Sequence, residues 1–133
     1  MTSNKILLIN PRQHEMLYVK MPRDYFMYHY PPLGLMYLSG ILEKNGYATE
    51  IIDTISNPLS EDDLVAKLKS EDFLFIGFYS NMITNQFVIK YCEAIRRKAN
   101  LPIVVGGPSS LAGTLFLRMI WWISYVMEKE REQ

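Results

Sequence analysis

Alternation between short apolar runs and helix patterns constrains the fold of this chain more than any other sequence feature. The first run, KILLIN at 5–10, has no polar alternation, which is typical of a parallel strand covered on both faces. Further strand patterns follow, each separated from the last by a helix pattern. This order predicts βαβ units, right-handed crossovers and a parallel sheet. The expected strands are residues 5–10, 47–53, 73–79 and 101–105.

Local signals bound the intervening helices. Pro31-Pro32 opens the first helix, because proline is tolerated in the first turn, and Asn45-Gly46 ends it. Ser60 and Asp63 have the spacing of a capping box, and Thr84 is the expected cap of the third helix. Helical spacing predicts the buried faces. They are Leu35, Leu38, Ile41 and Leu42; then Leu64, Val65 and Leu68; then Phe87, Val88, Tyr91, Cys92 and Ile95.

Small residues in the first helix suggest that it approaches the sheet closely. These residues are Gly34, Ser39 and Gly40. The expected fold is a three-layer α/β, Rossmann-like (flavodoxin-like) domain with a parallel sheet of order 2-1-3-4. We place this domain at residues 1–110 and an apolar, then charged, C-terminal helix at 111–133. No fifth strand is evident after residue 110.

Composition excludes several functions. A formal net charge of zero argues against a general nucleic-acid surface, which needs a basic excess. A single cysteine, Cys92, cannot close a zinc or iron–sulfur site, and its place on an apolar face predicts an inert core thiol. The N-terminus has no secretory pattern, so we expect a reducing, cytoplasmic setting.

The loops after the strands are the candidate site, because ligands of such sheets bind beyond the carboxyl ends of the strands. These loops carry no glycine-rich dinucleotide turn, no P-loop and no receiver-type acidic cluster. What remains is a set of uncharged polar tips and one Gly-Gly. Such tips suit a large neutral ligand better than a compact anion. The candidate binding residues are Asn10, Pro11, Asp53, Ser80, Asn81, Met82, Thr84, Gly106, Gly107 and Pro108.

Three runs, in this order and spacing, carry a family resemblance: PPLGLMYLSGILEKNGYATEIID, FIGFYSNMITN and LPIVVGGP. Over about residues 5–110 the sequence resembles the N-terminal cobalamin (B12)-binding domain of B12-dependent radical S-adenosylmethionine enzymes, a group of methyltransferases and the anaerobic magnesium-protoporphyrin monomethyl ester cyclase. The resemblance implies cobalamin as cofactor. It also implies that Ser80 and Gly106-Gly107 border the pocket for its nucleotide tail, with Thr84 close by.

Two departures from related proteins limit what the resemblance implies. The loop after the first strand lacks the D-x-H-x-x-G motif of cobalamin carriers, as the radical-enzyme group commonly does, so cobalt without a protein histidine is implied. His14 is the one candidate cobalt ligand, with a solvated loop histidine as the alternative. The chain also lacks the CxxxCxxC motif of the catalytic barrel. We therefore expect no turnover from this chain alone, and a radical S-adenosylmethionine domain as partner, covalent in the parent enzyme or in trans.

Each candidate also has a purely structural interpretation. Gly106-Gly107-Pro108 is equally typical of a tight turn, Ser80 and Thr84 of helix caps, and Asp53 of a strand end. The alternative function is a ligand-free degenerate α/β domain that acts in protein assembly. The stretch 115–127, apolar apart from Arg118 and Ser124, predicts packing partly on the sheet and partly on another chain. We expect a homodimer through Trp121 and Trp122. A membrane role is disfavoured by the short length of the stretch.

Overall fold

A computed structural model describes residues 3–11, 31–54, 56–82 and 84–108 of the chain. All strand pairs are parallel, and the sheet has the order β2-β1-β3-β4, as the sequence predicts. Three strands begin one or two residues later than expected. The described elements are β1 (Lys5–Asn10), α1 (Leu33–Lys44), β2 (Ala48–Asp53), α2 (Glu61–Ser70), β3 (Phe75–Tyr79), α3 (Asn85–Lys98) and β4 (Ile103–Gly106).

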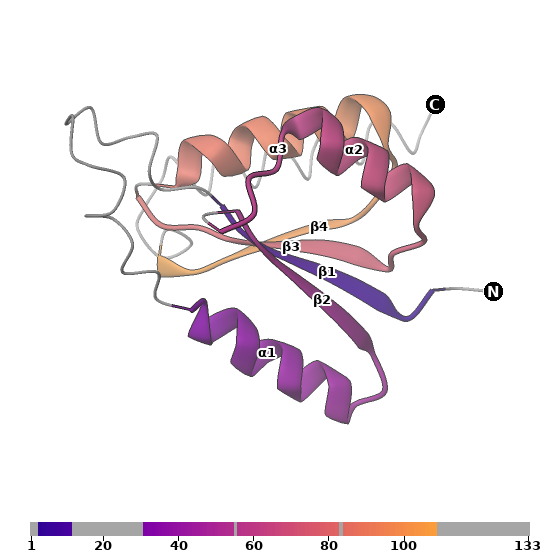
Figure 1. The fold of residues 1–133 in the computed structure, drawn as a ribbon, viewed down its shortest axis with the longest axis vertical. Coiled ribbons are helices and arrows are strands. Elements are labelled where there is room, and N and C mark those ends of the chain that lie inside the picture. The colour runs from indigo at the N-terminus through magenta and orange to yellow at the C-terminus, as the bar shows by residue number, and fades with distance from the viewer. Residues whose placement is uncertain (1–2, 12–30, 55, 83, 109–133) are drawn as a thin grey trace.

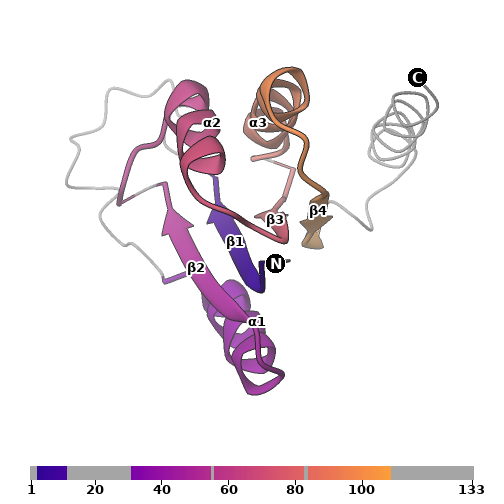
Figure 2. The same ribbon diagram turned by 90° about the vertical axis from the view of Figure 1, so that its right-hand side faces the viewer.

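The elements form three layers. Figures 1 and 2 show α2 and α3 on one face of the sheet and α1 on the other. This placement follows from right-handed crossovers, because the chain moves from β1 to β2 in one direction and then from β2 through β3 to β4 in the other. The predicted three-layer α/β fold is confirmed.

Strand β1 lies between the two helical layers and packs against both. Its four residues Ile6 to Ile9 are at most 1% exposed. Leu7 and Ile9 pack in the cluster under α2 and α3, whereas Ile6 and Leu8 pack with Leu35 of α1. Burying a side chain of this size contributes about 1.5–3 kcal/mol, so this one strand links two cores.

The predicted faces of α2 and α3 are confirmed. Leu64 and Val65 of α2 are buried, and Leu68 packs against the same cluster. All five predicted residues of α3 are buried, and the ring of Tyr91 stacks on that of Phe78 with 5.7 Å between centroids. Burial raises the pKa of the Cys92 thiol to about 12, so this cysteine is the inert core group that the sequence predicts.

The predicted face of α1 is only partly correct. Leu35 is buried and Leu42 is half-buried, but Leu38 and Ile41 are exposed. Ser39 faces the sheet, where its hydroxyl pairs with that of Thr49 on β2. An added Cβ at Gly34 or Gly40 would meet nothing within 4 Å, so the expected close approach of these two glycines is wrong. The helix sits on the sheet through a narrow stripe because it packs mainly on β2 and β1.

Helix ends follow the expected signals at two places. The Asn45-Gly46 stop is confirmed, with Gly46 in the left-handed region at φ +87°. The hydroxyl of Ser60 accepts the backbone N–H of Asp63 at 3.1 Å and caps α2. None of the described helices is long and apolar enough to cross a membrane.

Four charged side chains form an alternating network at the amino-terminal end of the sheet. Lys5 Nζ contacts carboxylate oxygens of Glu50 at 2.9 Å and of Glu71 at 2.5 Å. Lys67 Nζ contacts the same two residues at 2.8 and 2.7 Å. The ring of Phe73 lies beneath the two ammonium groups. Hydrogen bonds from Lys5 and then Lys67 lower the pKa of the Glu71 carboxyl to about 2.

The network predicts acid sensitivity. Because the pKa of Glu71 in the folded state lies below its ordinary value of 4.5, its contribution to stability is present above about pH 4.5 and is lost as the pH falls toward about 2. Glu71→Gln removes this contribution, so the variant should lose less stability between pH 6 and pH 3 than the natural chain. Urea unfolding at the two pH values measures the difference. Glu93→Gln, on the exposed side of α3, is the matched control; equal acid losses in all three proteins would contradict the prediction.

Candidate functional site

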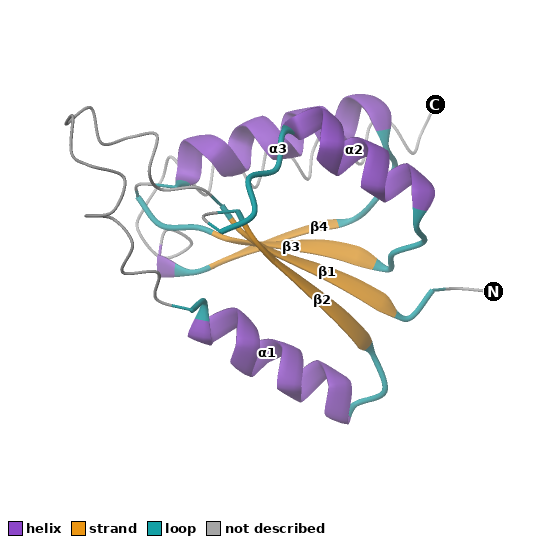
Figure 3. Cartoon of the chain, viewed as in Figure 1, coloured by secondary structure: helices purple, strands orange, loops and turns teal. Residues whose placement is uncertain are grey.

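The candidate site lies along the carboxyl ends of the four strands. Figure 3 shows these ends at one side of the sheet, where the connections to the following segments begin. The connections from β1 and β3 leave toward opposite faces, to α1 and α3 respectively. This reversal of strand order is the point at which parallel α/β sheets bind ligands.

Asn10 and Asp53 meet at the ends of β1 and β2. The two residues are register partners, and Asn10 Nδ2 donates to Asp53 Oδ1 at 3.2 Å. Asn10 is buried, as is Pro11 after it. The hydroxyl of Thr54 donates to the Asn10 carbonyl at 2.9 Å and ties the two strand ends together. The structure thus brings the predicted residues Asn10, Pro11 and Asp53 together at one corner of the sheet edge.

Ser80 and Gly107 meet at the ends of β3 and β4. The backbone N–H of Ser80 donates to the Gly106 carbonyl at 2.7 Å. Gly107 has φ +116°, and a Cβ there would clash with the carbonyl oxygen of Ser80 and lie 3.1 Å from its nitrogen. Only glycine combines this conformation with this close approach. The predicted contact between the third and fourth tips is present in the structure.

The side chain of Ser80 is the unusual feature of this junction. Ser80 is fully buried, and its Oγ has no hydrogen-bond partner among the described residues. A buried hydroxyl without a partner costs about 1–3 kcal/mol, so such groups mark sites where something else supplies the bond. The sequence placed Ser80 at the tip but gave no sign that its hydroxyl would be unpaired.

Asn81 and Thr84 form the start of α3. The backbone N–H of Thr84 donates to Asn81 Oδ1 at 2.8 Å, and the Asn81 N–H donates to Thr84 Oγ1 at 3.0 Å. Thr84 occupies the N-cap position of α3, as the sequence predicts, but its side chain makes no capping hydrogen bond to the helix and forms this reciprocal pair with Asn81 instead. The Asn-x-x-Thr spacing in the sequence could have indicated this reciprocal pair. Thr84 is fully buried and its hydroxyl accepts the Asn81 N–H.

Three predicted residues present themselves to solvent at this edge. Met82 is 84% exposed, which is extreme for a large apolar side chain. Gly106 and Pro108 are also exposed, and a Cβ on Gly106 would meet nothing within 4 Å. The tips of β3 and β4 therefore offer an apolar side chain and bare backbone, with no ionisable group between Ser80 and Thr84 or between Gly106 and Pro108.

The described residues contain no group of three or more histidine, cysteine, aspartate or glutamate side chains arranged to hold a metal. His14, the candidate cobalt ligand, lies outside the described residues, as do Arg118, Trp121, Trp122 and Ser124.

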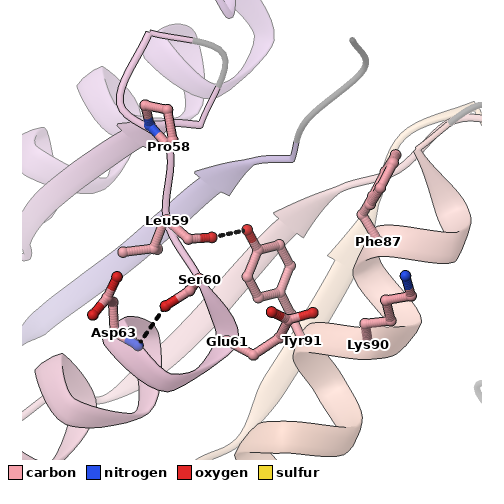
Figure 4. Close-up of a pocket in the computed structure, with 8 residues that line it drawn as sticks. All are labelled: Pro58, Leu59, Ser60, Glu61, Asp63, Phe87, Lys90 and Tyr91. Carbon is pink, nitrogen blue, oxygen red and sulfur yellow. Dashed lines mark hydrogen bonds between the residues drawn. The ribbon is translucent and has the colours of Figure 1, made fainter. Parts of the chain in front are cut away.

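A cleft of about 350 Å³ opens between the first turns of α2 and the middle of α3 (Figure 4). Two of its polar groups already have partners: the Tyr91 hydroxyl donates to the Leu59 carbonyl at 2.5 Å, and Ser60 caps α2. None of the predicted site residues lines it. We attribute the cleft to the packing of two helices. Its lining residues are Pro58, Leu59, Ser60, Glu61, Asp63, Phe87, Lys90 and Tyr91.

The fold places the chain among the doubly wound α/β domains, and the tips of β3 and β4 carry no charge. Domains of this class bind ligands above the carboxyl ends of their parallel strands. Residues 23–128 match the family model of the B12 binding domain, and the chain belongs to that family. This confirms the resemblance predicted from the sequence. No curated protein matches the chain.

Two solved structures resemble the chain in fold. Both are of TsrM from Kitasatospora setae, a radical S-adenosylmethionine methyltransferase. One structure holds cobalamin and an iron–sulfur cluster. It matches with a TM-score of 0.59 and 20% sequence identity, over 80% of this chain and 18% of the methyltransferase chain. The other holds tryptophan and an analogue of S-adenosylmethionine, and it matches with a TM-score of 0.59 and 21% identity, over 79% of this chain and 19% of the methyltransferase chain. The matched region is thus about a fifth of each methyltransferase chain.

The two glycines of the fourth tip give a matched pair of tests. Gly107→Ala should destabilise the fold by more than about 1 kcal/mol, because the left-handed conformation alone costs that much and the clash with Ser80 adds to it. Gly106→Ala should cost much less, since its Cβ enters open space. Urea unfolding followed by circular dichroism measures both. Equal losses would show that the junction tolerates a side chain.

Proposed function

We propose that this chain is a cobalamin-binding module that holds and orients B12 for a radical S-adenosylmethionine catalytic domain. The observation that carries the proposal is the buried, unpaired hydroxyl of Ser80 beside the bare backbone of Gly107. Family membership supports the choice of cofactor. The fold likeness to a radical S-adenosylmethionine methyltransferase with cobalamin bound supports the kind of catalytic partner.

The residues present fit such a cofactor. Ser80 Oγ is available to donate or accept one hydrogen bond, and it is shielded from water. Gly106 leaves open space at the strand tip, and Gly107 keeps the neighbouring backbone free of side chains. We assign Ser80, Gly106, Gly107 and Pro108 to the nucleotide tail. Thr84 contributes through the position of the Asn81-Thr84 turn, because its hydroxyl already accepts a backbone N–H.

The other tips would lie beneath the corrin ring. Met82 offers an exposed apolar contact, and Asn81 holds the turn that presents it. Asn10, Pro11 and Asp53 form the opposite wall, where the Asn10–Asp53 bond fixes both side chains. Uncharged walls on the β3–β4 side suit a broad ligand whose reactive centre is enclosed in its own macrocycle.

Cobalamin supplies the methyl-transfer or radical-linked chemistry when it is bound. This chain's own residues bind the cofactor, orient it and shield its tail from water. The chain contributes no catalytic residue. We propose that the binding unit is residues 1–110 and that residues 111–133 form a separate C-terminal helix.

Cobalamin retention tests the proposal. The purified chain, incubated with hydroxocobalamin and desalted, should keep a corrin absorption band near one equivalent. Ser80→Ala should weaken binding about five- to tenfold, the effect of one lost hydrogen bond, while leaving stability unchanged or raised by about 1 kcal/mol. Ser70→Ala, on α2, is the control. With S-adenosylmethionine and a reductant, the loaded chain should form no methylated or cyclised product.

The alternative is a ligand-free α/β domain that acts only in assembly. In that case the folded chain stays colourless after desalting, and Ser80→Ala changes stability alone. If the chain retains the corrin and Ser80→Ala binds it equally well, the chain is a cobalamin-binding module but Ser80 is not part of the binding site. The experiment therefore tests cobalamin binding and the assignment of Ser80 separately.

We also propose that the chain forms a homodimer in the cytoplasm through Trp121 and Trp122. The apolar composition of residues 115–127 supports it, because one face of such a helix would remain uncovered after packing on its own domain. Light scattering should give twice the chain mass of 15.5 kDa, and Trp121→Glu/Trp122→Glu should return the monomer. A monomeric mass that does not change with concentration would refute the dimer.

A further inference from the structure

The described helices leave half of one sheet face uncovered. On the side of α2 and α3, all four strands contribute to a continuous cluster. On the other side α1 packs on β1 and β2, and Figure 2 shows it beneath those strands rather than beneath β4. Val104 of β4 points to this side and is 52% exposed. Phe75 and Tyr79 of β3 also point to this side, where they are half-buried and pack against the cluster of Ile6, Leu8 and Leu35.

The flank of α1 continues this exposed surface. Ser39 and Glu43 bond to Thr49, so they mark the flank that faces β2, the outer strand. At 100° per residue, Leu38 and Ile41 fall on the opposite flank, toward β3. Leu38 is 43% exposed, Ile41 46% and Val104 52%. We call this surface the open half-face; it comprises Leu38, Ile41, Phe75, Tyr79 and Val104.

The open half-face has the character of a buried surface. Its members are large and apolar, and α1 carries no charged side chain before Glu43. Val104, in the middle of β4, is exposed to solvent, whereas its neighbours Ile103 and Val105 pack against the core cluster. Contiguous apolar patches of this kind mark surfaces that another segment or partner covers.

We propose that residues 115–127 of this same chain cover the open half-face. The chain leaves the described part at Pro108, directly after β4, the strand that carries Val104. Six residues lie between Pro108 and Leu115. The seven steps from Pro108 to Leu115 span up to about 23 Å, whereas neighbouring strands lie only about 4.8 Å apart. The connection is therefore long enough to reach any point of the open half-face.

Length and composition of the segment match the surface. As a helix, 13 residues measure about 20 Å, the length of a six-residue strand such as β1. The stretch LFLRMIWWISYVM has no polar stripe that would suit a solvent-exposed face. A helix that starts from the carboxyl edge and runs back along β4 would lie antiparallel to the strands, as in every βαβ unit of this fold. It would give the sheet the second helix that this face lacks among the described residues.

Tryptophan fluorescence offers a direct test, because both tryptophans of the chain, Trp121 and Trp122, lie in the segment. The full-length chain with Val104→Cys carries a nitroxide label on the open half-face; the buried Cys92, whose pKa is raised to about 12, does not compete for the label. The label at position 104 should abolish most of the tryptophan emission. Ile41→Cys, labelled in the same way, is the second reporter.

Lys69→Cys, exposed on α2 on the far side of the sheet, is the matched control and should leave the emission unchanged. Equal emission for labels at 104, 41 and 69, in chains that circular dichroism shows to be folded, would overturn the proposal. To separate the segment from a second copy, labelled chains with Trp121→Phe/Trp122→Phe are mixed with unlabelled natural chains. If excess labelled chains quench the natural chains in this mixture as fully as the label quenches tryptophans in its own chain, the surface belongs to the partner copy and the proposal is overturned. No cobalamin is present, so the result is independent of cofactor binding.

Discussion

The burial of β1 on both faces is the constraint on which the rest of this structure depends. Its side chains alternate between two cores, so α1 on one side and the α2–α3 pair on the other are positioned by the same six residues. Because β2 and β3 pair with β1 in fixed parallel register, the ends of the strands are fixed as well. Asn10 therefore faces Asp53 as a consequence of apolar packing several residues away.

The two ends of the sheet are held together by different kinds of interaction. At the amino-terminal end, Lys5, Glu50, Lys67 and Glu71 tie β1, β2 and the end of α2 together through charge. At the carboxyl end, the tips of β3 and β4 are held by backbone contacts and the reciprocal pair of Asn81 and Thr84, without ionic pairs between their side chains.

The sequence predicted most of the fold, because periodicity reports burial directly. The faces of α2 and α3 were predicted residue by residue, since both helices pack fully on one side of the sheet. The face of α1 was not, because periodicity cannot show that no other helix of the described residues lies beside Leu38 and Ile41 on this face of the sheet. The N-cap position of α3 was predicted correctly, but its bonding was not, because the Thr84 hydroxyl accepts the N–H of Asn81 and makes no cap bond to the helix. The tips were located by topology, but the unpaired hydroxyl of Ser80 is a property of three-dimensional packing that no spacing encodes.

Gly107 has a consequence that extends beyond the sheet. Its positive φ turns the backbone at the point where β4 ends, and the Ser80 carbonyl against it leaves room for no side chain. The heading of the backbone at Pro108 is therefore set by a glycine that also borders the candidate site. The geometry of the site and the direction in which the described chain leaves β4 are in this way coupled through a single residue.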